Sequence, residues 1–325
     1  MVNITIIKLG AKGDVVRTLP VLKAIKNKYP ESTITWITKE NSIPILIGNK
    51  DIDNLISPHE ITNFQTDIMY NFDMDEEATS IVSKIQSSKK YGFYSSGGYP
   101  AALNIGAEYY LNTLFDDSLK KENKKTYQEM IFEAAELPYH KEEPDIFLSE
   151  KDLGYSNEFI KSNNINLDNL IGIHLGASSR WPSKTWAENK VKEFIIKAKQ
   201  RGYDILLFGG PDEKDRHEKL TSELKKENVS IFQNNPNNTD KEFAALVNIC
   251  KKMVCSDSFS LHVSIALKKP TIGLFFCTSP YEVEGYSYLD KIISPVLYSF
   301  FPEKMDQYDE GLVNSISADE VINKL

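Results

Sequence analysis

Apolar and polar residues along the first half of the chain alternate between a strand-like pattern and a helix-like pattern. Residues 2–9 form a run rich in β-branched side chains, and residues 14–29 have the pattern of a helix. In residues 32–38 successive side chains alternate, as they do on the two faces of a strand. The same criteria predict further strands at 67–72 and 91–94 and helices at 76–86 and 126–137.

A second set of β-α units begins near Leu170. Its predicted strands are 171–175, 203–208, 229–232, 253–255 and 271–276, and its predicted helices are 186–201, 212–227, 240–251, 258–268 and 317–325. The strand at 271–276 is almost continuously apolar, which suits the interior of a parallel sheet covered on both faces. Two successive sets predict an α/β protein of two doubly wound domains, which we place at residues 1–165 and 166–325.

Length, charge and cysteine content narrow the class of protein. A chain of 325 residues is long enough for about two domains. Its net charge of −8 argues against broad nucleic-acid binding, which requires a basic surface. No apolar run reaches the roughly 18–20 residues that span a bilayer, and the first residues lack the features of a signal peptide. We therefore expect a cytoplasmic protein, and the charge is compatible with peripheral contact with the inner face of a membrane.

Three cysteines without a C-x-x-C pair argue against a disulfide framework and against a structural zinc site. Cys277 follows a predicted strand but has no histidine near it in sequence, so we expect a packed thiol rather than a nucleophile.

The first candidate site is the loop that follows the first predicted strand. It contains Gly10, Lys12, Gly13 and Asp14, and the spacing of its glycines does not match a dinucleotide fingerprint. An aspartate here would repel a pyrophosphate, so the loop favours a carboxylate base directed at a hydroxyl. The alternative interpretation is that Asp14 only caps the helix.

The second candidate site is the segment 176–186, which follows a strand and opens a helix. It offers hydroxyls from Ser178 and Ser179 and cations from Arg180 and Lys184. Helix N-terminal N–H groups add further donors, so a diphosphate is a natural ligand. The alternative is a solvated cationic loop packed over tryptophans.

The third candidate site is the segment 255–262, where a short strand leads into a helix. Asp257, Ser258 and His262 lie there, and the free N–H groups of the first turn could hold phosphate oxygens. A capped helix with a structural histidine is the alternative. Gly209 and Gly210 end another strand, and Asp212 or the neighbouring Glu213 could bind a ribose or simply suit the helix dipole.

Four segments, in this order and at these separations, resemble glycosyltransferase family 9, the heptosyltransferase-like enzymes. They are I-I-K-L-G-A-K-G-D-V-V-R-T-L-P-V-L-K-A-I at the N-terminus, the small-residue loop ending in K-x-W at 184–186, F-G-G-P at 208–211, and S-D-S with His262 and A-L-K-K-P. Phe259 and the pair Phe276-Cys277 depart from this pattern, because the family usually has glycine at the first position and glycine-proline at the second.

The resemblance implies a GT-B fold, in which two Rossmann-like domains face a central cleft, with the acceptor on the first domain and the nucleotide sugar on the second. It implies an inverting transfer without a metal or other cofactor, with Asp14 as the base and Lys184 pairing with the diphosphate of the leaving group. The implied acceptor-side loop contains Gly10, Lys12 and Gly13. The implied nucleotide-sugar site contains Ser178, Ser179, Gly209, Gly210, Asp212, Asp257, Ser258 and His262.

The leading functional hypothesis is therefore transfer of a heptose or related sugar from a nucleotide diphosphate, with ADP favoured, to a lipopolysaccharide-type glycan or glycolipid of the cell envelope. Transfer to a protein acceptor is an alternative. A sugar-nucleotide epimerase and a non-catalytic nucleotide-sugar-binding protein on the same fold are further alternatives. The intact Asp14 loop argues against an epimerase, because that carboxylate is useful chiefly to activate a second substrate. Retention of both Asp14 and Lys184 argues against a non-catalytic protein, for which Phe259 and Phe276 are the best support.

Overall fold

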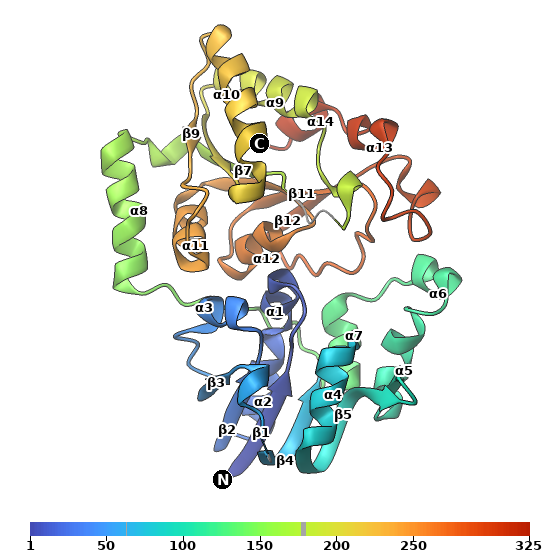
Figure 1. Ribbon diagram of the computed structural model, residues 1–325. Helices are drawn as coiled ribbons and strands as arrows, with labels where there is room; N and C mark the ends of the chain where they lie inside the picture. The colour runs from blue at the N-terminus through green and yellow to red at the C-terminus, as the bar shows by residue number, and fades with distance from the viewer. Residues whose placement is uncertain (63, 177–179) are drawn as a thin grey trace. The chain divides into compact units, whose positions relative to one another are not determined.

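The computed structural model describes residues 1–62, 64–176 and 180–325, which fold into two compact units. Unit 1 comprises Met1–Phe147 together with Tyr281–Glu284, and unit 2 comprises Leu148–Pro280 together with Gly285–Leu325. Each unit contains a six-stranded sheet among the described residues (Figure 1). A short segment from late in the sequence is thus part of the first unit.

The sheet of unit 1 has the strand order β3-β2-β1-β4-β5-β6. Its strands are β1 (Val2–Ile7), β2 (Ser32–Ile37), β3 (Asn54–Ile56), β4 (Phe64–Asn71), β5 (Ile85–Ser96) and β6 (Tyr99–Ala102). All neighbours pair in parallel except β5 and β6, which pair antiparallel. Ile4 of β1 is in register with Ile34 of β2 and Ile68 of β4, and these three side chains are buried.

The α-helices of unit 1 connect these strands. They are α1 (Lys12–Thr18), α2 (Pro20–Lys28), α3 (Ile43–Leu46), α4 (Glu76–Lys84), α5 (Ile105–Asn112), α6 (Asp117–Glu122) and α7 (Tyr127–Ala134). The predicted helix 14–29 is thus two helices, because Pro20 has no backbone N–H and starts a new helix instead of continuing α1.

The sheet of unit 2 has the order β12-β11-β10-β7-β8-β9, and every neighbouring pair is parallel. Its strands are β7 (Leu170–His174), β8 (Asp204–Phe208), β9 (Phe232–Gln233), β10 (Lys252–Ser256), β11 (Thr271–Phe275) and β12 (Leu289–Ile293). β11 is buried along its whole length, as its continuous apolar sequence predicts.

The α-helices of unit 2 are α8 (Glu150–Asn163), α9 (Glu188–Gln200), α10 (Lys214–Lys226), α11 (Asp240–Ile249), α12 (Phe259–Ala266), α13 (Glu310–Asn314) and α14 (Ala318–Ile322). Among the described residues, no helix has both the length and the apolar character needed to cross a membrane.

The two units separate between Phe147 and Leu148, whereas we placed the boundary after residue 165. The difference is α8, which occupies the polar stretch where we expected a join. α8 packs on α11, and Asn238 Nδ2 donates a hydrogen bond of 2.6 Å to Tyr155 Oη of α8. The short strands β3, β6 and β12 were also not predicted, because edge strands have few of the buried apolar positions that reveal a strand.

Both sheets reverse their strand order at one position. In unit 1 the reversal lies between β1 and β4, and in unit 2 it lies between β7 and β10. Loops that leave two such strands diverge to opposite sides of the sheet, and ligands of open α/β folds bind in the crevice that this leaves at the carboxyl ends. The prediction of two doubly wound, Rossmann-like units is confirmed.

Trp186 anchors the loop after β7 to the core of unit 2. Its side chain is fully buried, packs on Phe194 at a ring-centroid distance of 5.8 Å, and donates from Nε1 to the carbonyl of Ile316 at 2.9 Å. The tryptophan thereby joins the start of α9 to the C-terminal segment and fixes one end of the segment that carries Lys184.

We predict that Trp186→Ala lowers the free energy of unfolding of unit 2 by about 3–5 kcal/mol, because it leaves a cavity and an unpaired carbonyl. Urea unfolding followed by circular dichroism measures this loss. Trp181→Ala, which truncates a half-buried tryptophan of the same loop, is the matched control. Equal losses in the two variants would contradict the anchoring role.

Candidate functional site

Asp73 closes the carboxyl end of the sheet in unit 1. It follows β4, and its carboxylate accepts hydrogen bonds from Lys8 Nζ at 2.5 Å, from Leu9 N, and from Gly10 N at 2.9 Å. Lys8 and both backbone donors follow β1, so the interaction spans the position where strand order reverses. Asp73 therefore fixes the start of the glycine-containing loop that leads to Asp14.

The ion pair between Lys8 and Asp73 is buried, with 4% and 10% of the two side chains exposed. Burial opposes the charge on Lys8, but Asp73 together with Tyr127, Asp14 and Tyr110 outweighs this and holds the pKa of the ammonium above its usual value. Asn71 Nδ2 donates to the Asp73 carbonyl, and Asn71 Oδ1 accepts from its N–H, so the backbone of Asp73 is fixed as well.

Asp14 is the third residue of α1, and Ala11 occupies the N-cap position. The carboxylate of Asp14 is therefore not in the capping position, which disfavours the interpretation that it only caps the helix. One third of its side chain (33%) is exposed, and Oδ1 lies 2.7 Å from an Nη atom of Arg17. This is a reachable carboxylate with a cation beside it.

A buried tyrosine supports Arg17. The guanidinium carbon lies 3.8 Å from the centroid of the Tyr127 ring, and the Tyr127 hydroxyl is 2.7 Å from Thr18 Oγ1. Thr18 Oγ1 in turn donates to the carbonyl of Asp14 at 2.6 Å. Both the side chain and the backbone of Asp14 are thus connected to Tyr127 at the start of α7.

The acceptor-side glycines have distinct positions. A side chain at Gly10 would lie 3.2 Å from Asp73 Oδ1 and 3.3 Å from Asp14 Oδ2, so this residue sits between the two carboxylates. Gly13 is buried on α1, and Lys12 is the first residue of the helix and half-buried.

In unit 2, Lys184 and Asp257 form the corresponding ion pair across the strand-order reversal. Lys184 Nζ lies 3.0 Å from Asp257 Oδ2 and 3.2 Å from the Asp257 carbonyl. The side chains are 16% and 15% exposed, so this pair is more accessible than the pair in unit 1. Ser183 Oγ fixes the lysine-bearing turn by donating to the Gln307 carbonyl and accepting from Asp309 N.

The other residues of the third candidate segment gather around Asp257. His262 Nε2 lies 3.8 Å from Asp257 Oδ1, and Ser258 is the N-cap residue of α12. Ser258 Oγ donates to the Ser256 carbonyl at 3.1 Å and lies 3.0 Å from Ser260 Oγ. Asp257, Ser258, His262 and Lys184 are thus brought together, as the motifs indicated.

The residues that depart from the family pattern have packing roles. The ring of Phe259 stacks on Phe243 of α11 at a centroid distance of 5.7 Å. Phe276 and Cys277 are buried in the core of unit 2. Burial raises the pKa of the Cys277 thiol to about 11, which supports a packed thiol rather than a nucleophile.

An asparagine that sequence analysis missed holds the F-G-G-P segment. Asn234 Oδ1 accepts from Gly209 N at 2.9 Å, and Asn234 Nδ2 donates to the Gly209 carbonyl at 3.1 Å. A side chain at Gly209 would collide with His217, whose ring lies 2.2 Å from the ideal Cβ position. Glycine is therefore required here for close packing.

Glu213 lies against Gly176 and Gly210, the glycines that follow β7 and β8. Asp212 is exposed, whereas Glu213 Oε2 accepts from Gly210 N at 2.8 Å. A Cβ atom at Gly176 would lie only 2.4 Å from Glu213 Oε1, so the absence of a side chain at Gly176 makes room for the carboxylate. The remaining predicted residues, Ser178 and Ser179, lie outside the described residues.

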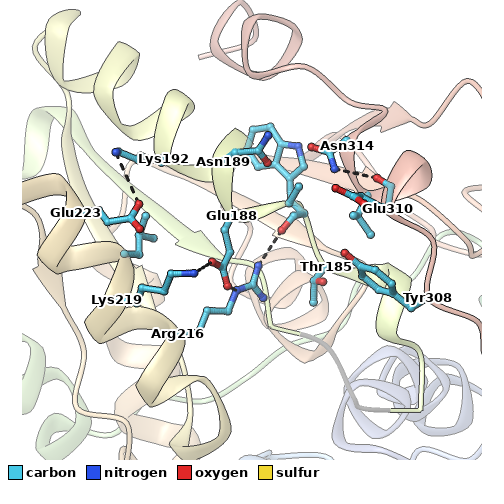
Figure 2. Close-up of a pocket in the computed structure, with 14 residues that line it drawn as sticks. Thr185, Glu188, Asn189, Lys192, Arg216, Lys219, Glu223, Tyr308, Glu310 and Asn314 are labelled. Carbon is cyan, nitrogen blue, oxygen red and sulfur yellow. Dashed lines mark hydrogen bonds and ion pairs between the residues drawn. The ribbon is translucent and has the colours of Figure 1, made fainter.

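A groove of about 700 Å³ opens beside the segment that carries Lys184 (Figure 2). Thr185 and Trp186 line it together with residues of α9, α10 and α13. Its cations are paired: Arg216 Nε lies 3.2 Å from Glu188, and Lys192 contacts Glu223 and Glu227. Of the predicted site residues that the structure describes, none lines this groove.

Two of the missed residues, Lys8 and Asp73, have a recognisable signal. They directly follow the first and fourth strands of the unit 1 sheet, where a doubly wound topology places ligand-binding loops. Arg17 lies one helical turn after Asp14, a spacing at which opposite charges pair. Asn234 had no such signal, because its partner Gly209 lies 25 residues away.

Both units have the strand order of Rossmann-like folds and carry charged residues at the strand-order reversal, and two such units in one chain are the architecture of the GT-B class of glycosyltransferases. Solved structures agree: a glycosyl transferase family 9 protein from Veillonella parvula superposes with a TM-score of 0.80 at 19% identity, covering 99% of this chain and 96% of that one. The E. coli ADP-heptose lps heptosyltransferase II structure gives a TM-score of 0.69 at 16% identity, covering 99% and 97%.

Residues 73–307 match the sequence model of glycosyltransferase family 9 (heptosyltransferase), and the chain belongs to this family. It is 22% identical over 312 residues to the lipopolysaccharide core heptosyltransferase OpsX of Haemophilus influenzae, covering 90% of this chain and 84% of that protein. It is 28% identical over 163 residues to lipopolysaccharide heptosyltransferase 2 of Escherichia coli K12, covering 49% of this chain. That match spans about half (45%) of the relative's length. The family predicted from the motifs is confirmed.

Half-buried His174, at the end of β7, predicts that acid destabilises the fold. Burial lowers its pKa from 6.5 to about 4, although Glu213 opposes the shift. Because the folded state resists protonation while the unfolded chain accepts a proton near pH 6.5, stability should fall as the pH drops from 6.5 to 4. The loss should reach roughly 3 kcal/mol at the acid end.

Urea unfolding at a series of pH values tests this expectation. His174→Gln should flatten the dependence between pH 4 and 6.5, and His59→Gln, at an exposed histidine of unit 1, should leave it unchanged. An identical slope in His174→Gln and the parent chain would rule out His174 as the cause.

Proposed function

We propose that this chain is an inverting glycosyltransferase that moves a heptose or related sugar from a nucleotide diphosphate to a lipopolysaccharide-type acceptor. Membership of family 9 supports the class of reaction, and the relatives named as lipopolysaccharide heptosyltransferases support the sugar and the acceptor. The observation that carries the proposal is the pair of charged positions at the two strand-order reversals: a reachable carboxylate in unit 1 and a lysine held by an aspartate in unit 2.

In this proposal, Asp14 accepts the proton of the acceptor hydroxyl. The hydroxyl oxygen then forms a bond to the anomeric carbon of the donor sugar from the face opposite the diphosphate. The bond from that carbon to the diphosphate oxygen breaks, and its electron pair leaves with the diphosphate. A carboxylate that is one-third exposed and lies 2.7 Å from a terminal nitrogen of Arg17 suits this role.

Lys184 stabilises the negative charge that develops on the leaving diphosphate. The supporting geometry is its position at the carboxyl end of β7, in a turn fixed by Ser183, with Asp257 directing the ammonium. This cation would do the work that a metal does in other transferases, so we propose a transfer that needs no metal or other cofactor. The N-terminal end of α12, with Ser258 and His262 nearby, would contact the same diphosphate.

The donor that we favour is ADP-linked, and its ribose would bind Glu213. The Glu213 carboxylate lies close to Gly176 and Gly210, whereas Asp212 is exposed. This favours Glu213 over Asp212 as the residue that binds the ribose. A glycolipid acceptor would place the enzyme in the cytoplasm, in peripheral contact with the inner face of the membrane.

We predict that Asp14→Asn lowers kcat for sugar transfer by about 10²–10⁴-fold while donor binding is kept, because the amide cannot accept the proton.

Lys184→Met should lower kcat by about 10²–10³-fold and also weaken nucleotide binding. Transfer rates with ADP-heptose and lipopolysaccharide core acceptor, together with calorimetric titration of ADP, measure both effects.

Asp117→Asn on α6 and Lys219→Met on α10 change exposed residues of the same types and serve as matched controls with parental activity. An Asp14→Asn variant with parental kcat would refute the base assignment. Loss of donor binding in all four variants would indicate unfolding, which circular dichroism detects separately.

A thermal-shift screen identifies the donor class. Among ADP, UDP, GDP, CDP and dTDP, we expect ADP to raise the melting temperature most, and magnesium should not change the shift, because binding to the folded state stabilises it by mass action. Glu213→Gln should reduce the shift with ADP, and Asp212→Asn should not. A shift that requires magnesium would contradict the metal-independent proposal.

A further inference from the structure

Arg17 is held in place from two sides. Its guanidinium lies over the Tyr127 ring at 3.8 Å, and one of its terminal nitrogens lies 2.7 Å from Asp14 Oδ1. Only 17% of its side chain is exposed, compared with 33% for Asp14. The arginine is therefore the covered partner of the pair, and the carboxylate is the partner that a substrate can reach.

The Tyr127 platform is itself rigid. Thr126 and Glu129 form a capping box at the start of α7, and the N–H of Tyr127 donates to the carbonyl of Glu282 at 2.9 Å. The Tyr127 hydroxyl binds Thr18, and the ring meets Tyr110 edge-on at 5.8 Å. An arginine resting on such a ring has little freedom to move away from Asp14.

We infer that Arg17 is a positioning residue that fixes the orientation of the Asp14 carboxylate and favours its ionised form. This inference rests on the proposed function of Asp14 as the base. A carboxylate is useful as a base only if it is both unprotonated and aimed, and a cation at 2.7 Å favours the ionised form while the stacked guanidinium limits side-chain rotation.

Other charged and titratable groups face the same region. Lys8 and Asp73 lie beyond Gly10 and form their own buried pair, and Asp14 is one of the negative groups that raise the pKa of Lys8. Glu282 and the phenols of Tyr110 and Tyr127 contribute to the electrostatic surroundings of Arg17. Burial raises the pKa of Tyr127, which keeps this phenol neutral around pH 7.

The test is the pH dependence of kcat in Arg17→Met, which removes the charge and the stacked plane but keeps an apolar stem. We expect kcat at pH 7 to fall by about 10- to 100-fold with KM for the donor within twofold. The acid limb of the kcat profile should shift to higher pH by about 1–3 units. Arg17→Lys, which restores the charge without the planar stack, should return the acid limb close to its original position and recover part of kcat. Arg201→Met, at an exposed arginine of unit 2 whose guanidinium donates to the Ile322 carbonyl, is the control.

A second measurement does not depend on activity. Carboxyl-¹³C NMR of aspartate-labelled protein, with Asp14→Asn for assignment, gives the pKa of Asp14 with and without Arg17. An upward move in Arg17→Met supports the inference, and an unchanged pKa together with an unchanged acid limb overturns it. If Arg17→Met does not fold, Arg17→Gln takes its place with the same expected outcomes. Parental activity in Asp14→Asn would instead refute the proposed function, and the NMR result would still decide the role of Arg17.

Discussion

An ion pair between a lysine and an aspartate at the carboxyl end of the sheet is the interaction on which each unit depends. Lys8 pairs with Asp73 in unit 1, and Lys184 pairs with Asp257 in unit 2. In both cases the partners follow strands that flank the reversal of strand order, where two loops diverge and leave the sheet end open. The pair joins these loops where backbone pairing has ended.

The two pairs differ in burial, and this separates their roles. Lys8 and Asp73 are almost completely covered, and Asp73 also binds two backbone N–H groups, so this pair acts within the fold. A buried pair of this kind is costly to break, because either partner left alone is an uncompensated charge. Lys184 and Asp257 are more accessible, and the ammonium can share its charge with an incoming anion. The same type of ion pair therefore holds two loops together in unit 1, whereas in unit 2 its lysine remains more accessible.

Much of the fold follows from the sequence because doubly wound sheets bury their central strands on both faces. β1, β7 and β11 are apolar enough to be recognised directly, and the glycine-containing loops after β1 and β7 mark two of the candidate sites. The edge strands β3, β6 and β12 could not be recognised, since their side chains are only partly buried. Asp14, Lys184 and Asp257 were selected from short motifs, whereas Asn234 depends on a contact with a distant glycine that no local pattern encodes.

The segment Tyr281–Glu284 has a consequence for how this chain can be divided. The polypeptide passes from one unit to the other three times, after Phe147, Pro280 and Glu284. The returning segment supplies the carbonyl of Glu282 to Tyr127 and places the Tyr281 ring 3.8 Å from Lys124 Nζ. A fragment that stops at residue 147 would lack these contacts, and a chimaera that joined the first half to the second half of a relative would import a foreign segment into the support of its own Asp14 loop. Exchange of whole halves between family members is therefore constrained by four residues that lie far from the obvious junction.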